Sequence, residues 1–149
     1  MIVEKITGQL QHTKKAVDEI TLEWYERDKK RMRKVSKDGE EIGIAVETGL
    51  KENDILYEDD NRVIVVKYAP SELIQISVAS MQEMGRLCFE LGNRHMTLEI
   101  RENTVTIPYD AFIYAYLQNQ GFKLQTILGK YTDYIGCKAH EHTHGHSQL

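Results

Sequence analysis

The chain has 149 residues and a formal net charge of −4, with 41% hydrophobic and 28% charged residues, a composition typical of a globular protein of one ordinary domain or two small ones. The negative charge argues against nucleic acid as the main partner, and the chain shows neither an apolar run of about 18 residues nor the apolar core of a signal peptide. We therefore expect no nucleic acid and no membrane among its partners, a cytoplasmic location, and reduced thiols at Cys88 and Cys137.

Residues 1–70 are predicted to form a small all-β domain. Their apolar or alternating runs are rich in Ile, Val, Tyr and Trp, and turn sequences such as Lys37-Asp38-Gly39 separate them. The expected strands are residues 1–6, 20–25, 42–46, 54–57 and 62–68. We interpret the basic cluster at residues 29–34 as a solvated strand edge whose charges oppose aggregation; the alternative is a landing site for an acidic partner.

Residues 71–136 are predicted to form a second domain that begins with a strand and a helix. The apolar strand spans residues 73–78, and Ser80 with Glu83 three residues later forms a capping box that opens the helix. Apolar residues then recur at steps of three and four, and Gly92 is placed to end the helix. This stripe comprises Met81, Met84, Leu87, Cys88 and Leu91. Because Cys88 belongs to the stripe, we expect it to be an inert core residue.

A hairpin, a helix and a strand are predicted to complete this domain. Residues 96–101 and 104–109 read as two strands joined by a tight turn. Asp110 can cap a helix that runs to Gln120 and stops at Gly121, and residues 122–128 alternate as a final strand. The order βαββαβ is the ferredoxin-like arrangement, so the predicted fold class is α+β. Residues 131–137 are expected to pack only loosely on this domain.

Residues 137–149 are predicted to be a flexible, disordered tail that binds metal. The tail carries His140, His142, His144 and His146, and imidazole is the commonest ligand for nickel, copper and zinc. Two alternatives are a solvated tail without a role and an expression tag, although a tag usually carries uninterrupted histidines. The tail alone names neither the metal nor its purpose.

Cys137 is an additional candidate metal ligand. The sequence Cys137-Lys-Ala-His140 has ligand-like spacing, and a thiolate would shift preference toward zinc or copper(I). A single Cys-x-x-His without a second pair is a weak signal.

The segment from Met81 to His95 resembles the UreE family of urease accessory nickel metallochaperones. The similarity centres on its Met-x-Glu-Met-Gly start and its Gly92-Asn-Arg-His95 end, and is supported by Asp54-Ile-Leu-Tyr-Glu-Asp-Asp60 and the histidine-rich C-terminus. The resemblance implies a non-enzymatic protein that donates Ni(II) during assembly of the urease metallocentre. It also implies a homodimer through the second domains, in which His95 meets its twin.

The resemblance has further implications. Partners would be the urease apoprotein assembly and its accessory GTPase, tail histidines would add ligands, and Zn(II) or Cu(II) would compete for the site. The first domain would resemble the peptide-binding part of Hsp40-type chaperones. Where some family members carry a His-x-His pair before the second helix, this chain has Tyr109, Asp110 and Ala111, so that accessory site is expected to be missing or weaker.

Two other functions stand as alternatives. A histidine-rich metal store or sensor without a delivery role is compatible with the tail. A hydrolytic metalloenzyme is disfavoured, because there is no His-Glu-x-x-His and only His12 and His95 lie outside the tail.

Overall fold

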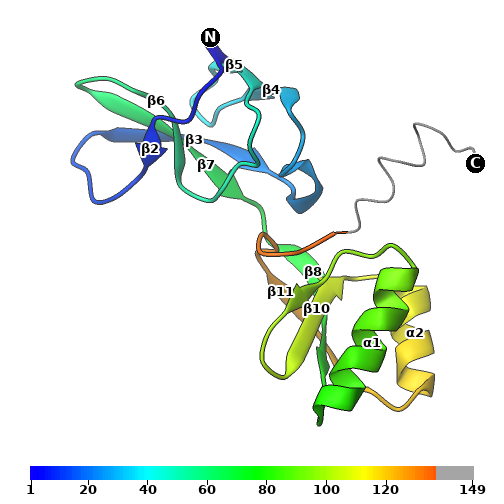
Figure 1. The fold of residues 1–149 in the computed structure, drawn as a ribbon. Coiled ribbons are helices and arrows are strands. Elements are labelled where there is room, and N and C mark those ends of the chain that lie inside the picture. Colours follow the sequence, from blue (N-terminus) through cyan, green and yellow to red (C-terminus); the bar gives the residue numbers. More distant parts are fainter. Residues whose placement is uncertain (137–149) are drawn as a thin grey trace, which may run out of the picture. The chain divides into compact units, whose positions relative to one another are not determined.

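The structure is a computed structural model that describes residues 1–136. The chain divides into two compact units, Met1–Pro70 and Ser71–Leu149 (Figure 1). The described elements form a mixed α+β protein, as predicted. Within residues 1–136 no helix has the length and apolar character needed to cross a membrane.

The first unit consists of two β-sheets. Its strands are β1 (Ile2–Val3), β2 (Gly8–Gln9), β3 (Ala16–Leu22), β4 (Arg31–Val35), β5 (Glu41–Ala45), β6 (Asp54–Glu58) and β7 (Arg62–Tyr68). One sheet has the order β1-β5-β4 and the other the order β2-β6-β7-β3. β1 pairs with β5 and β3 pairs with β7 in parallel, whereas the other pairs are antiparallel.

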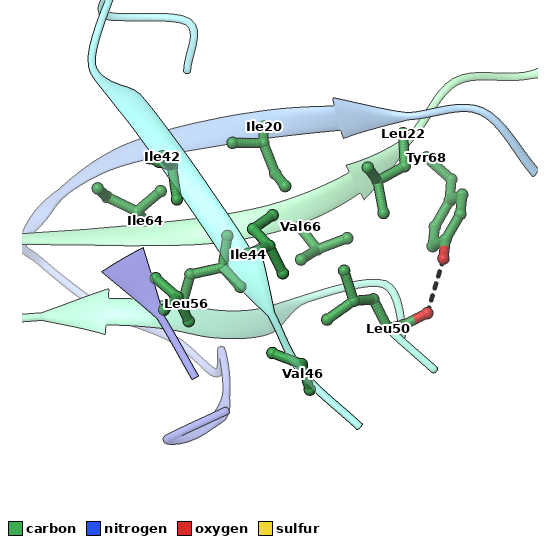
Figure 2. Close-up of a cluster of buried hydrophobic side chains, with 11 residues drawn as sticks. Ile20, Leu22, Ile42, Ile44, Val46, Leu50, Leu56, Ile64, Val66 and Tyr68 are labelled. Carbon is green, nitrogen blue, oxygen red and sulfur yellow. Dashed lines mark hydrogen bonds between the residues drawn. The ribbon is translucent and has the colours of Figure 1, made fainter. Parts of the chain in front are cut away.

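The main core of this unit is an aliphatic cluster to which both sheets contribute (Figure 2). Within it the Tyr68 hydroxyl donates a hydrogen bond to the Leu50 carbonyl at 2.7 Å, which satisfies a polar group that burial would otherwise leave unpaired. The continuous apolar run of strand β7 is explained by its position between two apolar clusters. Ile64 and Val66 face this cluster, while Val63 and Val65 pack with Ile55 and Leu10 in a second one. Both faces of β7 are therefore buried, which removes the alternation of a half-exposed strand.

The observed strands differ from the prediction at several places in this unit: β4 is not among the five expected strands, and β3 begins at Ala16 rather than at residue 20. The expected strand at residues 1–6 is reduced to β1, and β2 follows it. The strand expected at residues 20–25 ends at Leu22, and Trp24–Glu26 form a 3₁₀ turn (η1) instead. The local reason is Glu26, whose carboxylate accepts the backbone N–H of Glu23 at 2.9 Å and so closes the turn.

The basic cluster lies largely on β4, at the edge of its sheet, which confirms the strand-edge interpretation. Acidic side chains accompany it: Lys34 Nζ lies 2.8 Å from Glu26 Oε1, and Lys30 Nζ lies 3.6 Å from Glu47 Oε1. This local pairing weakens the alternative of a landing site for an acidic partner, because the positive field is partly neutralised.

Two carboxylates hold the hairpin of β4 and β5 in place. Asp18 on β3 is buried, and its Oδ1 accepts the backbone N–H groups of Glu19 at 2.8 Å and Asp38 at 3.0 Å. Burial acts to raise the pKa of Asp18, but the hydrogen bonds from Ser36, Asp38 and Glu19 outweigh it and hold this pKa below its ordinary value. The pKa of Glu26 is likewise lowered, since hydrogen bonding to Lys34 and Glu23 outweighs burial.

These shifts predict that acid destabilises the first unit. A carboxylate with a depressed folded-state pKa stabilises the fold above its ordinary pKa, here 3.8 for Asp18 and 4.5 for Glu26, and loses that contribution as the pH falls through the folded value. Asp18→Asn should lower the unfolding free energy at pH 7 by about 1–3 kcal/mol and flatten its decline below about pH 5. Urea unfolding followed by the fluorescence of Trp24, the only tryptophan, measures both.

The exposed carboxylate Glu4 provides the control. Glu4→Gln should leave the unfolding free energy at pH 7 nearly unchanged. An Asp18→Asn protein whose stability declined as steeply with acid as the wild type would contradict the role of Asp18.

The second unit is a four-stranded antiparallel sheet with two helices on one face (Figure 1). Its elements are β8 (Ser71–Ser77), α1 (Met81–Asn93), β9 (Glu99–Ile100), β10 (Thr104–Pro108), α2 (Ala111–Asn119) and β11 (Lys123–Gly129). The sheet order is β11-β8-β10-β9, and the element order is the predicted βαββαβ. Aliphatic residues of β8, β10 and both helices form the core between the sheet and the helices.

Strand β9 is shorter than the predicted 96–101. Met96 donates its backbone N–H to Leu91 at the end of α1, and Leu98 pairs with Ile135. These residues are therefore engaged elsewhere and leave only Glu99 and Ile100 to pair with β10.

Two tyrosines of residues 131–136 are buried, so the expectation of loose packing was wrong for them, whereas Asp133, Ile135 and Gly136 are exposed. Tyr131 is fully buried, Tyr134 is buried, and their rings stack with centroids 5.0 Å apart. The alternating pattern ends at Gly129, and the sequence offered no periodic signal for a segment held by two aromatic rings and a single β-bridge.

Candidate metal centre

Helix α1 carries the candidate site and starts as its sequence predicts. The Ser80 hydroxyl accepts the backbone N–H of Glu83 at 3.1 Å, and the Glu83 carboxylate accepts the backbone N–H of Ala79 at 2.7 Å. The reciprocal bond of the capping box thus reaches one residue further back than usual. Leu87 and Leu91 are buried and fix the rotation of the helix on the sheet.

The helix ends slightly later than predicted, because Gly92 lies inside it. Arg94 is the C-cap, His95 donates its backbone N–H to Gly92 at 2.9 Å, and Met96 donates to Leu91 at 3.1 Å. These two bonds define a Schellman motif whose left-handed position is His95, with φ of +60°. Glycine is the usual residue there, since a side chain in this conformation costs roughly 1–2 kcal/mol.

The conformation of His95 therefore lowers stability, and a side chain kept at such a cost is a candidate for a functional role. His95 is exposed to solvent, and its imidazole can act as a nitrogen ligand or as a hydrogen-bonding group. The rigid cap presents this ring from a fixed backbone position, as a pre-organised ligand requires.

Three side chains connect the end of α1 to α2 just before His95. The Tyr116 hydroxyl donates to Glu90 Oε2 at 2.6 Å, and Arg94 Nη2 lies 3.7 Å from the same oxygen. The Arg94 guanidinium also lies over the Tyr116 ring, 4.6 Å from its centroid. The hydrogen bond to the Glu90 carboxylate is the main reason that the pKa of Tyr116 is raised. This cluster restrains the backbone that leads into His95.

The outward side of α1 is an apolar stripe that runs toward His95. We define the α1 stripe as Met81, Gly85, Phe89 and Gly92, which recur at steps of four, four and three. Met81 is 88% exposed and Phe89 is 76% exposed. No other part of the described chain comes within 4 Å of a Cβ built on either glycine. Glycine inside a helix lowers its stability by about 1 kcal/mol relative to alanine. No contact within residues 1–136 explains why glycine stands at these two positions, whereas the close approach of another surface would explain it.

Cys88 and Asp110 have structural roles. Cys88 Sγ lies 3.7 Å from Met84 Sδ at the margin of the core, and burial raises the pKa of this thiol. The protonated thiol is a poor metal ligand, in agreement with the prediction of an inert residue. The Asp110 carboxylate caps α2 by accepting the backbone N–H of Ile113 at 3.0 Å.

Of the predicted ligands, the structure describes His95 alone. Cys137, His140, His142, His144 and His146 lie outside the described residues. Within residues 1–136, no group of three or more His, Cys, Asp or Glu side chains could hold a metal ion. His95 is therefore the one candidate donor whose position the described part of the chain gives.

Sequence reasoning missed two features around His95. The predicted helical stripe places Met81 on the buried side of the helix, but Met81 is exposed and belongs to the α1 stripe. The position of Phe89, four residues after Gly85, was a sequence signal for this second stripe. The left-handed conformation of His95 was also missed, although a helix that continues through Gly92 without a later glycine would have indicated it.

Comparisons with known proteins match the chain over almost its whole length. The model of the UreE urease accessory protein N-terminal domain matches residues 3–69, and that of the C-terminal domain matches residues 71–149. The urease accessory protein UreE of Acetivibrio thermocellus is 36% identical over 152 residues, which cover 99% of both chains. That of Flavobacterium johnsoniae is 33% identical over 153 residues, which cover 99% of this chain and 93% of the relative.

A third relative is more similar but longer. The urease accessory protein UreE of Bifidobacterium longum subsp. infantis is 44% identical over 121 residues, which cover 81% of this chain but only 55% of the relative. Two family models that together span both units, and relatives aligned over almost their full length, lead to one conclusion. The chain belongs to the UreE family of urease accessory proteins.

Proposed function

We propose that this protein is a nickel metallochaperone that donates Ni(II) during assembly of the urease metallocentre. The observation that carries the proposal is His95, an exposed imidazole held in a left-handed cap that glycine would occupy at lower cost. The protein would act without catalysis of its own. Its partners would be the urease apoprotein assembly and the accessory GTPase, in the cytoplasm.

The α1 stripe supports a homodimer through the second unit. Exposed Met81 and Phe89 would bury apolar surface, and Gly85 and Gly92 would let a second backbone approach closely. An interface around a two-fold axis repeats each contact, so a stripe that leads to His95 would bring two copies of this residue together. Two imidazoles at the axis leave positions open on Ni(II), which favours square-planar or octahedral geometry.

Tail histidines would fill the open positions. His140 lies four residues beyond Gly136, an extended span of at most about 14 Å, and His146 lies ten residues beyond it. A site that is completed by a tethered segment can also reopen, which suits a protein that must release its metal. Cys137 is a further candidate donor, and Zn(II) or Cu(II) would compete for the same ligands. The first unit, residues 1–70, would serve partner or peptide binding.

Nickel transfer is the experiment that separates a carrier from a metal store or sensor. We expect the nickel-loaded dimer to activate purified apo-urease in the presence of its accessory proteins, in proportion to the nickel supplied. The matched control is the same protein loaded and then treated with chelator. Nickel that is bound at His95 but never reaches urease would favour the store.

A further inference from the structure

The segment that leads into the C-terminal tail is attached to Thr97 and Leu98, which follow His95 by two and three residues. Leu98 donates its backbone N–H to the Ile135 carbonyl at 2.9 Å, and Ile135 donates its own to the Leu98 carbonyl at 2.8 Å. The Tyr131 hydroxyl donates to Thr97 Oγ1 at 2.9 Å. The loop after α1 and the segment after β11 lie at the same end of the second unit (Figure 1).

The attachment continues to the last described residue. A Cβ built on Gly136 would lie 3.6 Å from the Thr97 methyl carbon, so the chain at Gly136 lies against Thr97, two residues from His95. We define the tail anchor as residues 131–136 together with their contacts to Thr97 and Leu98.

The tail anchor contains two buried tyrosines, Tyr131 and Tyr134. Tyr131 is 0% exposed and stacks on Tyr134, whereas the side chain of Ile135 is 61% exposed. The backbone of Ile135, not its side chain, therefore makes the connection to Leu98. The two tyrosines and the backbone bonds of Ile135 to Leu98 together fix the position of the chain just before residue 137.

We propose that the tail anchor is a positioning element that sets the effective concentration of the tail histidines at His95. A tethered ligand binds with an effective concentration that falls roughly as the −3/2 power of the tether length. With Gly136 held beside Thr97, the tether to His142 is only six residues. This inference rests on the proposed function, because it needs nickel at His95 and donors in the tail.

The first experiment compares two substitutions at Ile135. Ile135→Pro removes the N–H that donates to Leu98, whereas Ile135→Ala keeps it and shortens an exposed side chain. Each is made with the natural tail and in a full-length background in which His140, His142, His144 and His146 are alanine. Equilibrium dialysis measures nickel affinity per dimer, and circular dichroism measures folding.

We expect Ile135→Pro to weaken nickel binding severalfold with the natural tail and to leave affinity unchanged in the four-alanine background. Ile135→Ala should match the parent in both. An equal loss from Ile135→Pro in both backgrounds would overturn the proposal, because the segment would then support only the fold or the His95 loop. No loss in either background would overturn it as well.

A change of tether length provides the second test without altering the anchor. Insertion of twelve Gly/Ser residues between Gly136 and Cys137 triples the tether to His142, so the tail-dependent gain in nickel affinity should fall about fivefold. The same twelve residues added after Leu149 should have no effect. An unchanged gain after the internal insertion would overturn the proposal.

The outcomes also separate this inference from the proposed function. If the wild-type protein bound no nickel, or bound it equally well without His95, the proposed function would fail. If nickel binding required His95 and the tail but neither the anchor variant nor the insertion altered it, only the tail anchor would fail.

Discussion

Replacing His95 with alanine is expected to lower the nickel affinity of the proposed dimer at least about 100-fold. Loss of a group that merely orients a metal ligand already lowers metal affinity about 10- to 100-fold, and this substitution would remove two imidazoles from the proposed dimer, one from each subunit. Equilibrium dialysis with analysis of bound nickel measures the effect. Unchanged affinity and stoichiometry per dimer would contradict a site at His95.

His95→Gly is the matched variant that separates metal binding from folding. Both variants lack the imidazole and should lose nickel equally, but only glycine relieves the left-handed backbone at φ of +60°. We expect the second unit of His95→Gly to be more stable than that of His95→Ala by about 1 kcal/mol. Urea unfolding followed by the helical circular dichroism signal reports on this unit, because both α-helices of the described chain lie in it.

Replacing Phe89 with aspartate is expected to convert the proposed dimer to a folded monomer with weak nickel binding. The side chain is 76% exposed within one chain, so a charge there is tolerated by the monomer. At a self-complementary interface the substitution would bring a buried charge from each subunit, at a cost of several kcal/mol. Analytical ultracentrifugation gives the mass, and nickel dialysis on the same samples gives the affinity.

Leu128 on β11 provides the control for Phe89. It is 74% exposed, almost the same as Phe89, but it lies on a strand rather than on the α1 stripe. Leu128→Asp should remain dimeric and bind nickel normally. A dimer that persisted in Phe89→Asp would show that the α1 stripe is not the interface.

Local sequence signals predicted the second unit well. Strand β8, the capped start of α1, the cap of α2 by Asp110 and the final strand β11 each depend on residues within a few positions of one another. Strand β7 was also predicted with its observed limits, since an apolar run of that length between turn residues is a strong signal. The resemblance of the Met81–His95 segment to the UreE family was equally a property of the local sequence.

Elements that depend on distant partners were predicted less well. Strand β9 is short because Leu98 pairs with Ile135, 37 positions away in the chain. The 131–136 segment was expected to pack loosely, since nothing in its own sequence shows that Tyr131 finds a hydrogen-bond partner in Thr97. Hydrophobic periodicity shows which face of a segment is buried, but it does not show which other segment covers that face.

The sequence by itself determined the α+β class and the family of the chain, and it predicted metal ligation with His95 as the most specific histidine. Those properties reside in residue types and short spacings. Only the tertiary structure decided that His95 occupies a left-handed cap, that an exposed apolar stripe leads to it, and that Gly136 lies against its loop. Each of these depends on backbone geometry or on contacts between residues far apart in the chain, which helical and strand periodicity do not encode.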